Sequence, residues 1–301
     1  MHIFVCLDSA PLRSLPLWAA FTDAQRAIPG LKITLLGDEE IVECMKIHPA
    51  VSSIHPLDMV GMGQFAFFPR GWRARQSLRE TLSQHSDSTG CIDPIGSAET
   101  RSIVRAFNGV SKMRRVGVAN FTDPKRDYDY TSVFPLPEEL NTIQSIRVLF
   151  AAALGYSLHD LTPDFGLGNP DQEHDGDVDL LVETSALPWS PEQVEHFRER
   201  IALTGLRVAY VNMHSAAQVR SEWSHIASAN YVLTGLSGGA WLAAALGRPG
   251  LCLCPVSTAA SSGVISTRWA RQKMINLDQQ PFNQPEVVAE SVIQVLGRHP
   301  A

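Results

Sequence analysis

Three features are missing from this sequence, and each absence excludes a class of protein. No apolar run reaches the length of a membrane-spanning helix. The first residues, MHIFVCLDSAP, have no basic flank and their apolar run stops at Asp8, so we expect a buried first strand rather than a secretory signal. Basic residues are not in excess. The net charge of −6 argues against a dedicated nucleic-acid-binding protein.

Cysteine is scarce, and its count is odd. The five cysteines lie mostly inside apolar segments, which is typical of reduced thiols in a cytosolic protein. Cys252 and Cys254 alternate along GLCLCPV, so on a strand they would share one face. No further cysteine or histidine cluster follows nearby, and we interpret them as small core residues rather than metal ligands. We therefore expect a cytoplasmic protein without a metal site.

A nucleotide-cofactor fingerprint is also missing. The turn after the first strand reads DSAPLRS and lacks the Gly-x-Gly-x-x-Gly pattern of dinucleotide-binding enzymes. We therefore disfavour an NAD(P) enzyme and expect no cofactor.

What is present is a repeating pattern of short apolar runs and amphipathic segments. The chain has 301 residues, 45% of them hydrophobic, which is enough for two cores of ordinary size. Runs such as HIFVCL (2–7) predict strands, and stretches such as LPLWAAFTDAQRAI (15–28) predict helices. Ser190 before Pro191 predicts another helix start. Strands that alternate with helices form parallel sheets, so we expect an α/β protein.

The pattern is interrupted between residues 160 and 179. This stretch, DLTPDFGLGNPDQEHDGDVD, is rich in proline, glycine and acidic residues and has no periodicity. A long helix is predicted before it, at 137–156. We therefore predict two Rossmann-like parallel-sheet domains that face a cleft, where ligands bind at the carboxyl ends of strands. The predicted parts are an N-terminal domain over 1–157, a linker over 158–178 and a C-terminal domain over 179–301.

The segment LTGLSGGAWLAAALGRP (233–249) places a glycine turn before an apolar helix. Small residues let backbone N–H groups converge at the helix N-terminus, which is a geometry that binds phosphate. Such a turn also serves to pack a helix onto a sheet, and both interpretations stay open. Ser237 has the strand–turn–helix context of a hydrolase nucleophile. However, the only histidine after it is His299 in the tail, so a catalytic triad is disfavoured.

Charged clusters offer further candidates. Two Asp-x-Asp pairs, at 127–129 and 177–179, match a pattern of metal–nucleotide chelation, but we interpret both as solvated loops. Arg70, Arg73 and Arg75 predict either a solvated face or a platform for an anionic substrate, since guanidinium groups match phosphate and carboxylate oxygens.

Asp8 follows the first strand, where the chain turns out at the edge of the sheet. A carboxylate at that place acts either as a general base or as a cap of the next turn, and the sequence leaves both open.

Several long segments, in their order along the chain, resemble one enzyme family. The chain is similar to the ADP-heptose:lipopolysaccharide heptosyltransferases of glycosyltransferase family nine, above all those that add the first heptose, and the likeness covers nearly its whole length. The segments are LPLWAAFTDAQRAIPGLK (15–32), CIDPIGSAETRSIVRAFNGV (91–110), RVLFAAALGYS (147–157), PWSPEQVEHFRERI (188–201), ASANYVLTGLSG (227–238) and LAAALGRP (242–249).

The resemblance implies a GT-B fold of two Rossmann-like domains and a metal-independent transfer that inverts the sugar's configuration. It implies a nucleoside-diphosphate sugar, ADP-heptose, as the donor and a lipid-linked acidic saccharide of the lipopolysaccharide core as the acceptor. Peripheral contact with the inner membrane follows from such an acceptor.

The resemblance also assigns residues. The family's diphosphate loop matches Thr234, Gly235, Leu236, Ser237 and Gly238 in the C-terminal domain, where Thr184 and Ser185 match a pair of hydroxyls that reaches the same phosphates. In the N-terminal domain, Asp93 and Gly96 match an Asp-x-x-Gly turn near the acceptor. Arg101 stands for a basic residue there, and the arginines at 70, 73 and 75 would hold the acceptor's negative charges.

Some family residues are missing. The family's catalytic aspartate follows a glycine after the first strand, and here only Asp8 offers a carboxylate. An expected lysine is absent near Leu187, and Leu233 stands where the family's loop has an aspartate. Gly238, Gly239 and a few extra residues stand in place of the family's histidine. These losses should weaken stabilisation of the departing diphosphate. The alternative is therefore a catalytically impaired glycosyltransferase-like protein that binds nucleotide or a protein partner.

Overall fold

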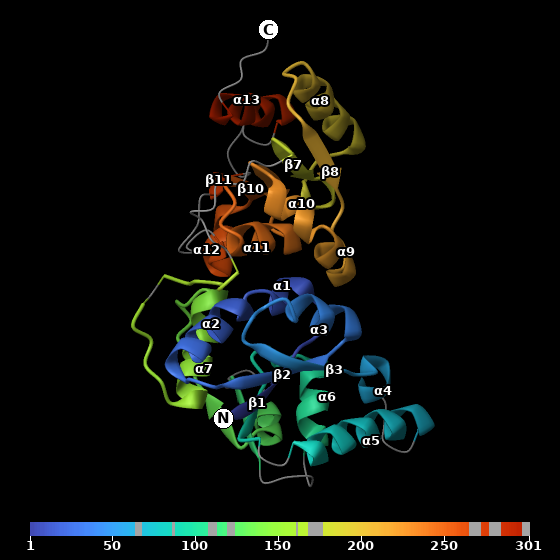
Figure 1. Ribbon diagram of the computed structural model, residues 1–301, viewed down its shortest axis with the longest axis vertical. Coiled ribbons are helices and arrows are strands. Elements are labelled where there is room, and N and C mark those ends of the chain that lie inside the picture. The colour runs from blue at the N-terminus through green and yellow to red at the C-terminus, as the bar shows by residue number, and fades with distance from the viewer. Residues whose placement is uncertain are drawn as a thin grey trace. The chain divides into compact units, whose positions relative to one another are not determined.

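The computed structural model describes residues 1–63, 68–85, 88–107, 113–118, 124–160, 162–167, 177–264, 272–276 and 284–296. The chain divides into two compact units, Met1–Gly166 and Leu167–Ala301 (Figure 1). The division falls inside the stretch 158–178, part of which lies outside the described residues, and the linker with its bounds stays a prediction.

Within its described residues, the first unit holds one parallel sheet of six strands. They are β1 (His2–Cys6), β2 (Lys32–Gly37), β3 (Val51–Pro56), β4 (Gly90–Ile92), β5 (Arg114–Val118) and β6 (Ser132–Phe134). Their spatial order is β3-β2-β1-β4-β5-β6, and every pair is parallel. The order of strands reverses between β1 and β4. Ligands of such sheets bind at this reversal, outside the carboxyl ends of the strands.

Helices cover this sheet, and their ends follow local sequence rules. Helix α7 is shorter than the predicted 137–156 because Asn141 and Gln144 form a capping box at its start. Gly155 ends it in a left-handed conformation. The described helices of this unit are α1 (Pro11–Ser14), α2 (Leu17–Ala27), α3 (Glu39–Met45), α4 (Met59–Gly63), α5 (Pro69–Gln84), α6 (Ala98–Ala106), the 3₁₀ helix η1 (Pro124–Asp129) and α7 (Thr142–Leu154).

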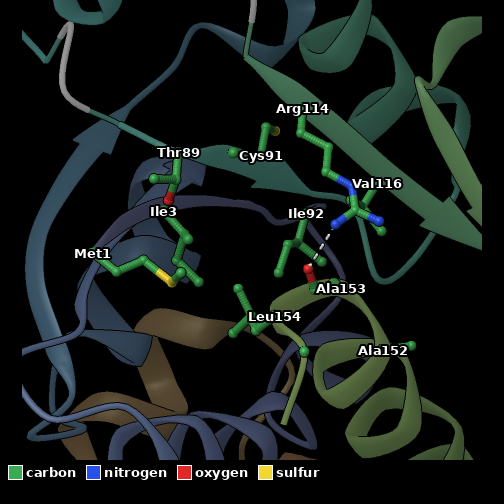
Figure 2. A pocket seen from close by; sticks show the side chains of 12 residues that line it. Met1, Ile3, Thr89, Cys91, Ile92, Arg114, Val116, Ala152, Ala153 and Leu154 are labelled. Atoms are coloured by element: carbon green, nitrogen blue, oxygen red, sulfur yellow. Dashed lines mark hydrogen bonds between the residues drawn. The ribbon is translucent and has the colours of Figure 1, made fainter.

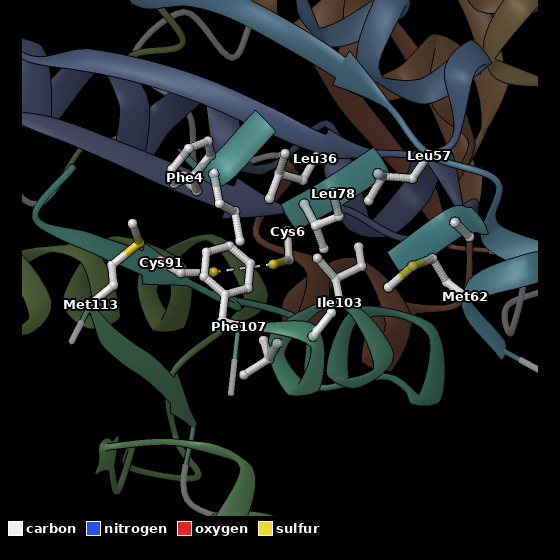
Figure 3. Packing of buried hydrophobic residues seen from close by; sticks show 14 of the residues in the cluster. Phe4, Cys6, Leu36, Leu57, Met62, Leu78, Cys91, Ile103, Phe107 and Met113 are labelled. Atoms are coloured by element: carbon white, nitrogen blue, oxygen red, sulfur yellow. Dashed lines mark hydrogen bonds between the residues drawn. The ribbon is translucent and has the colours of Figure 1, made fainter. Parts of the chain in front are cut away.

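One face of the first sheet packs against α5 and α6. Figure 3 shows Phe4 and Leu36 from the strands meeting Leu78 and Ile103 from these helices. The thiols of Cys6 and Cys91 lie 3.4 Å apart within this core (Figure 3). All five cysteines are buried and free, as the sequence predicts.

A pocket of about 260 Å³ opens at the amino ends of β1, β4 and β5, beside the last turn of α7 (Figure 2). The Arg114 guanidinium donates to the Ala153 carbonyl there at 3.1 Å. Because parallel sheets bind ligands at their carboxyl ends, we do not assign the active site to this pocket.

The second unit holds a second parallel sheet, with five strands among its described residues. They are β7 (Leu180–Glu183), β8 (Val208–Val211), β9 (Val232–Gly235), β10 (Gly250–Cys254) and β11 (Gln272–Asn276). Their order is β11-β10-β9-β7-β8, so here the order of strands reverses between β7 and β9. The described helices are η2 (Thr184–Ala186, 3₁₀), α8 (Pro191–Ala202), α9 (Ala216–Ser221), α10 (Trp223–Ser228), α11 (Gly238–Ala245), α12 (Val256–Ser262) and α13 (Pro285–Val295).

Two parallel-sheet α/β domains are therefore present, and the predicted fold class is confirmed. The predicted helix start at Ser190 is also confirmed, since Ser190 accepts from the Gln193 amide in a capping box. None of the helices in the described ranges combines the length and apolar character that a bilayer crossing requires.

Candidate active site

The predicted site residues follow the strands on both sides of each reversal point. In the first sheet, Asp8 comes two residues after β1, and Asp93 directly follows β4. In the second sheet, Thr184 directly follows β7, and Ser237 lies between β9 and α11. Because the strands of each sheet are parallel, these side chains sit at the carboxyl edge of their own sheet. Each unit therefore carries its own set of candidate site residues.

Asp8 is a buried carboxylate held by its own turn. It is 2% exposed, and the Ala10 amide donates to its Oδ1 at 3.0 Å. The Arg13 guanidinium lies 2.9 Å from its Oδ2. Burial raises the pKa of Asp8, while the Ala10 amide and the Arg13 charge lower it. The structure is compatible with both sequence interpretations of Asp8. The carboxylate caps its own turn, and a neighbouring cation stabilises the ionised form that a general base needs.

Asp93 is fully buried, and its carboxylate organises the next turn. Its Oδ1 accepts from the amides of Ile95 and Gly96, at 3.1 and 2.9 Å. Its Oδ2 accepts from the Tyr130 hydroxyl at 2.6 Å. Burial raises the pKa of Asp93, against these hydrogen bonds. The Asp-x-x-Gly turn is thus rigid, and its role in acceptor binding stays a prediction.

Arg101 lies on α6, close to this turn. Its guanidinium is 3.9 Å from Asp129, which also accepts from Arg105 at 2.9 Å. Asp129, from the first Asp-x-Asp pair, is therefore engaged by arginines. Asp179, from the second pair, forms an ion pair with Arg207 at 2.9 Å. Among the described residues, no cluster of three or more acidic, histidine or cysteine side chains could hold a metal ion.

The basic cluster lies on α5, and its three members have different surroundings. Arg70 makes a two-point ion pair with Asp58, at 2.5 and 2.7 Å. Arg75 donates to the backbone carbonyls of Gly71 and Met62. Arg73 is exposed and lines a hollow of about 490 Å³ together with Arg70. Of the three, Arg73 is the most accessible to an anionic ligand.

In the second unit, the glycine turn is built from small residues because the backbone is crowded. A Cβ on Gly235 would overlap the Ala186 carbonyl, and a Cβ on Gly239 would overlap the Glu183 carboxyl. The Ser237 hydroxyl caps α11 and accepts from two backbone N–H groups at 3.1 and 3.3 Å. The positive end of α11 therefore lies beside a hydroxyl, and the binding of a phosphate there stays a prediction.

The other predicted donor residues border the same turn. Leu236 and Ser237 are partly exposed, and Gly238 opens α11. Thr184 donates to the Asn212 side chain at 2.6 Å, and Ser185 accepts from the Met213 amide at 3.0 Å. Hence the two hydroxyls are fixed by the loop that follows β8. Their contact with a donor stays a prediction.

The sequence interpretation missed Glu183, the last residue of β7. Its side chain is fully buried, and its Oε2 accepts from the hydroxyls of Thr234 and Ser237. Burial raises the pKa of Glu183 to about 7, although the hydroxyls of Ser237, Thr234 and Ser185 lower it. The available signal was an acidic residue that ends an otherwise apolar strand, LLVE, directly before the hydroxyl pair.

The curated relatives that the chain matches carry the name lipopolysaccharide heptosyltransferase 1. No family model matches the chain. The chain is 26% identical to lipopolysaccharide heptosyltransferase 1 of Escherichia coli K12, over 89% of this chain and 93% of the relative. It is 27% identical to the enzyme of the same name from Pseudomonas aeruginosa, over 53% of this chain and 44% of the relative.

Solved structures show the same fold. The E. coli heptosyltransferase WaaC with ADP superimposes with a TM-score of 0.76 at 20% identity, over 99% of both chains. A glycosyltransferase family 9 structure from Veillonella parvula gives a TM-score of 0.69 at 14% identity, over 97% of this chain and 95% of the other. The resemblance inferred from the sequence and the GT-B fold are thus confirmed, and so is the expectation of a glycosyltransferase of the heptosyltransferase type.

Proposed function

We propose that this chain transfers a heptose from ADP-heptose to a lipid-linked acidic saccharide of the lipopolysaccharide core. One observation carries the proposal: a carboxylate, Asp8, and a glycine turn, Thr234–Gly238, each lie where the order of strands reverses in their own sheet. The chain is also similar to heptosyltransferase 1 along 89% of its length. A base and a diphosphate site are the two parts that such a transfer needs.

In this reaction, Asp8 is the general base. Its ionised carboxylate takes the proton of the acceptor hydroxyl, and the oxygen attacks the anomeric carbon of the heptose. The bond between that carbon and the donor's diphosphate breaks, and the configuration at the carbon inverts. ADP leaves with the bonding electron pair. The Arg13 charge favours the ionised form of Asp8 that accepts the proton.

The second unit stabilises the departing diphosphate. The N-terminus of α11 supplies a partial positive charge that costs no reorganisation during the reaction. Thr184, Ser185 and Ser237 contribute hydroxyls around it. The C-terminal unit contains a single lysine, Lys273, and the family's lysine near Leu187 is absent. We therefore expect donor binding to be retained better than turnover.

The acceptor side of the proposal rests on α5. Arg70 and Arg73 offer cationic groups to an acidic saccharide, and the exposed side chains of Phe68 and Trp72 lie beside them in the sequence. Aromatic and basic side chains together favour an interface with anionic lipid. We therefore propose that this surface contacts the cytoplasmic face of the membrane that holds the acceptor.

The test is a transfer assay with ADP-heptose and a Kdo-lipid acceptor. We expect turnover in the native chain and a loss of about 10²–10⁴-fold in Asp8→Asn, because the base is removed. The control is Glu139→Gln, which neutralises an exposed carboxylate. Binding of ADP without any transfer would instead support the impaired-protein alternative, and transfer unaffected by Asp8→Asn would show that another group is the base.

A further inference from the structure

A buried carboxyl group lies directly beneath the proposed diphosphate turn. Glu183 Oε2 accepts hydrogen bonds from Thr234 on β9 and from Ser237 at the start of α11. The backbone of Gly239 passes so close to this oxygen that a Cβ there would overlap it. The carboxyl group therefore forms the floor of the first turn of α11.

The second oxygen of the same group is unsatisfied. Glu183 Oε1 is buried and has no hydrogen-bond partner among the residues that the structure describes. A buried carboxylate oxygen without a donor is costly, whereas a protonated carboxyl places its proton on one oxygen and loses the charge. The geometry thus fits the neutral acid better than the ion.

Among the residues whose side chains the structure describes, no positive group compensates for the burial of Glu183. The groups that face it are the hydroxyls of Thr234, Ser237 and Ser185 and the thiol of Cys252 on β10. The pKa of the Cys252 thiol is itself raised, by its hydrogen bond with Cys254 and by burial, so this group is neutral. Within the described ranges no lysine, arginine or histidine pairs with Glu183. In the described part of this unit, the N-terminus of α11 supplies positive potential next to Glu183.

We propose that Glu183 makes donor binding proton-linked: its neutral form admits the diphosphate at the α11 N-terminus, and its ionised form repels it. This inference rests on the proposed function, which places the donor's diphosphate at Thr234–Gly238. The neutral carboxyl still accepts from Thr234 and Ser237 and so keeps both hydroxyls in position. The ion would compete with the diphosphate for the same helix end.

The direction of the pH effect follows from the position of this equilibrium. Burial raises the pKa of Glu183 to about 7, so the group is mostly neutral at about pH 6 and mostly ionised at about pH 8. A bound diphosphate raises the pKa further, and binding therefore takes up a proton. Donor affinity should fall about tenfold between about pH 6 and about pH 8, because the neutral fraction falls by that factor.

The experiment is calorimetric titration with ADP-heptose in the absence of acceptor. Its two phosphates are esterified on both sides, so the charge of the ligand is constant across this range. In the native chain we expect the tenfold loss of affinity and, near pH 7, the uptake of about half a proton, measured from the dependence of the heat on the buffer. Glu183→Gln should bind with nearly constant affinity and no proton uptake, whereas Glu139→Gln should behave like the native chain.

The outcomes separate this inference from the proposed function. Binding with the same pH dependence in Glu183→Gln as in the native chain would overturn the role of Glu183 and leave the donor site in place. No binding of ADP-heptose by the native chain at any pH would overturn both. If Glu183→Gln does not fold, proton uptake by the native chain still decides: binding without uptake near pH 7 would refute the proposal.

Discussion

The guanidinium of Arg13 lies 2.9 Å from the carboxylate of Asp8, across the turn that follows β1. The side chain of Asp8 is 2% exposed and that of Arg13 is 59% exposed, so a cation at the surface stabilises the negative charge of a buried carboxylate. Burial raises the pKa of Asp8 and Arg13 opposes that effect. Arg13 therefore lowers the pH at which the proposed base becomes ionised.

Replacing Arg13 should move the acidic limb of the pH–rate profile. A base with a raised pKa is protonated as pH falls through that pKa, and without Arg13 this happens at a higher pH. We expect Arg13→Ala to lower kcat/KM about two- to fivefold on the acidic side, since an ion pair with one exposed partner contributes only ~0.4–1 kcal/mol. At high pH, the loss should vanish.

The matched control is Arg200→Ala, which removes an exposed ion pair with Glu290 in the other unit. An equal loss of kcat/KM at all pH values in Arg13→Ala would show that Arg13 supports folding or binding rather than the ionisation of Asp8.

The hydrogen bond from Tyr130 to Asp93 should contribute to stability. Tyr130→Phe would leave a buried carboxylate oxygen without its donor, at a cost of about 1–3 kcal/mol in the free energy of unfolding. Burial raises the pKa of Asp93, so the stability that this carboxyl group contributes is greatest at low pH, where it is protonated, and is lost as pH rises. The Tyr130 hydroxyl stabilises the ionised carboxylate, which is populated at high pH. The destabilisation by Tyr130→Phe should therefore be smaller at about pH 4 than at about pH 8.

Urea unfolding at both pH values measures this difference. The control is Tyr128→Phe, because the Tyr128 side chain is 84% exposed. Equal destabilisation by the two substitutions would contradict the assigned role of the Tyr130 hydroxyl.

Much of the fold was predictable from local patterns, because strands such as β1 and β10 are short apolar runs followed by a turn. β6 (Ser132–Phe134) and β11 (Gln272–Asn276) were not predicted, since the first is only three residues long and the second is rich in polar residues. Ser190 marked a helix start through the capping chemistry that the structure shows. Glu183 was not predictable in this way. Its partner Thr234 is 51 residues away, and the two meet only because β9 pairs with β7 across the reversal of strand order.

The arginine cluster shows the same limit. The spacing of Arg70, Arg73 and Arg75 indicates a shared positive surface, but it does not reveal that Asp58 neutralises Arg70 from the preceding loop. Nor does it reveal that Arg75 is turned to backbone carbonyls. These are tertiary contacts, and composition and periodicity carry no information on them.

The close packing of Gly239 on Glu183 gives a further prediction. Gly239→Ala would place a Cβ against Glu183 Oε2 and 2.6 Å from Met213 Cε, so the turn must shift. We expect a loss of about 1–3 kcal/mol in the free energy of unfolding, together with weaker ADP binding. Gly63→Ala is the control, since a Cβ there meets nothing within 4 Å. Unchanged stability and ADP affinity in Gly239→Ala would contradict the described packing of the turn.

The last prediction concerns the charges that would hold an acidic acceptor. Replacing Arg70, Arg73 and Arg75 together should weaken acceptor binding, and the loss should shrink at high salt because exposed charges are screened. Donor binding should not change. Within the cluster, Arg73→Ala should account for most of the effect, because Arg73 is exposed and Arg70 is paired with Asp58.

Asp58→Asn tests the same surface from the opposite direction. It would release Arg70 from its ion pair, so acceptor affinity should rise about two- to fivefold, the size of effect expected for an exposed charge. Arg79→Ala is the control, since it removes an exposed charge from α5 outside the cluster. The measurement is the affinity of these variants for a Kdo-lipid acceptor at low and at high salt, which tests whether the arginine cluster binds the acceptor. Equal affinities in Arg73→Ala, Asp58→Asn and Arg79→Ala would mean that the cluster is only a solvated face of the helix.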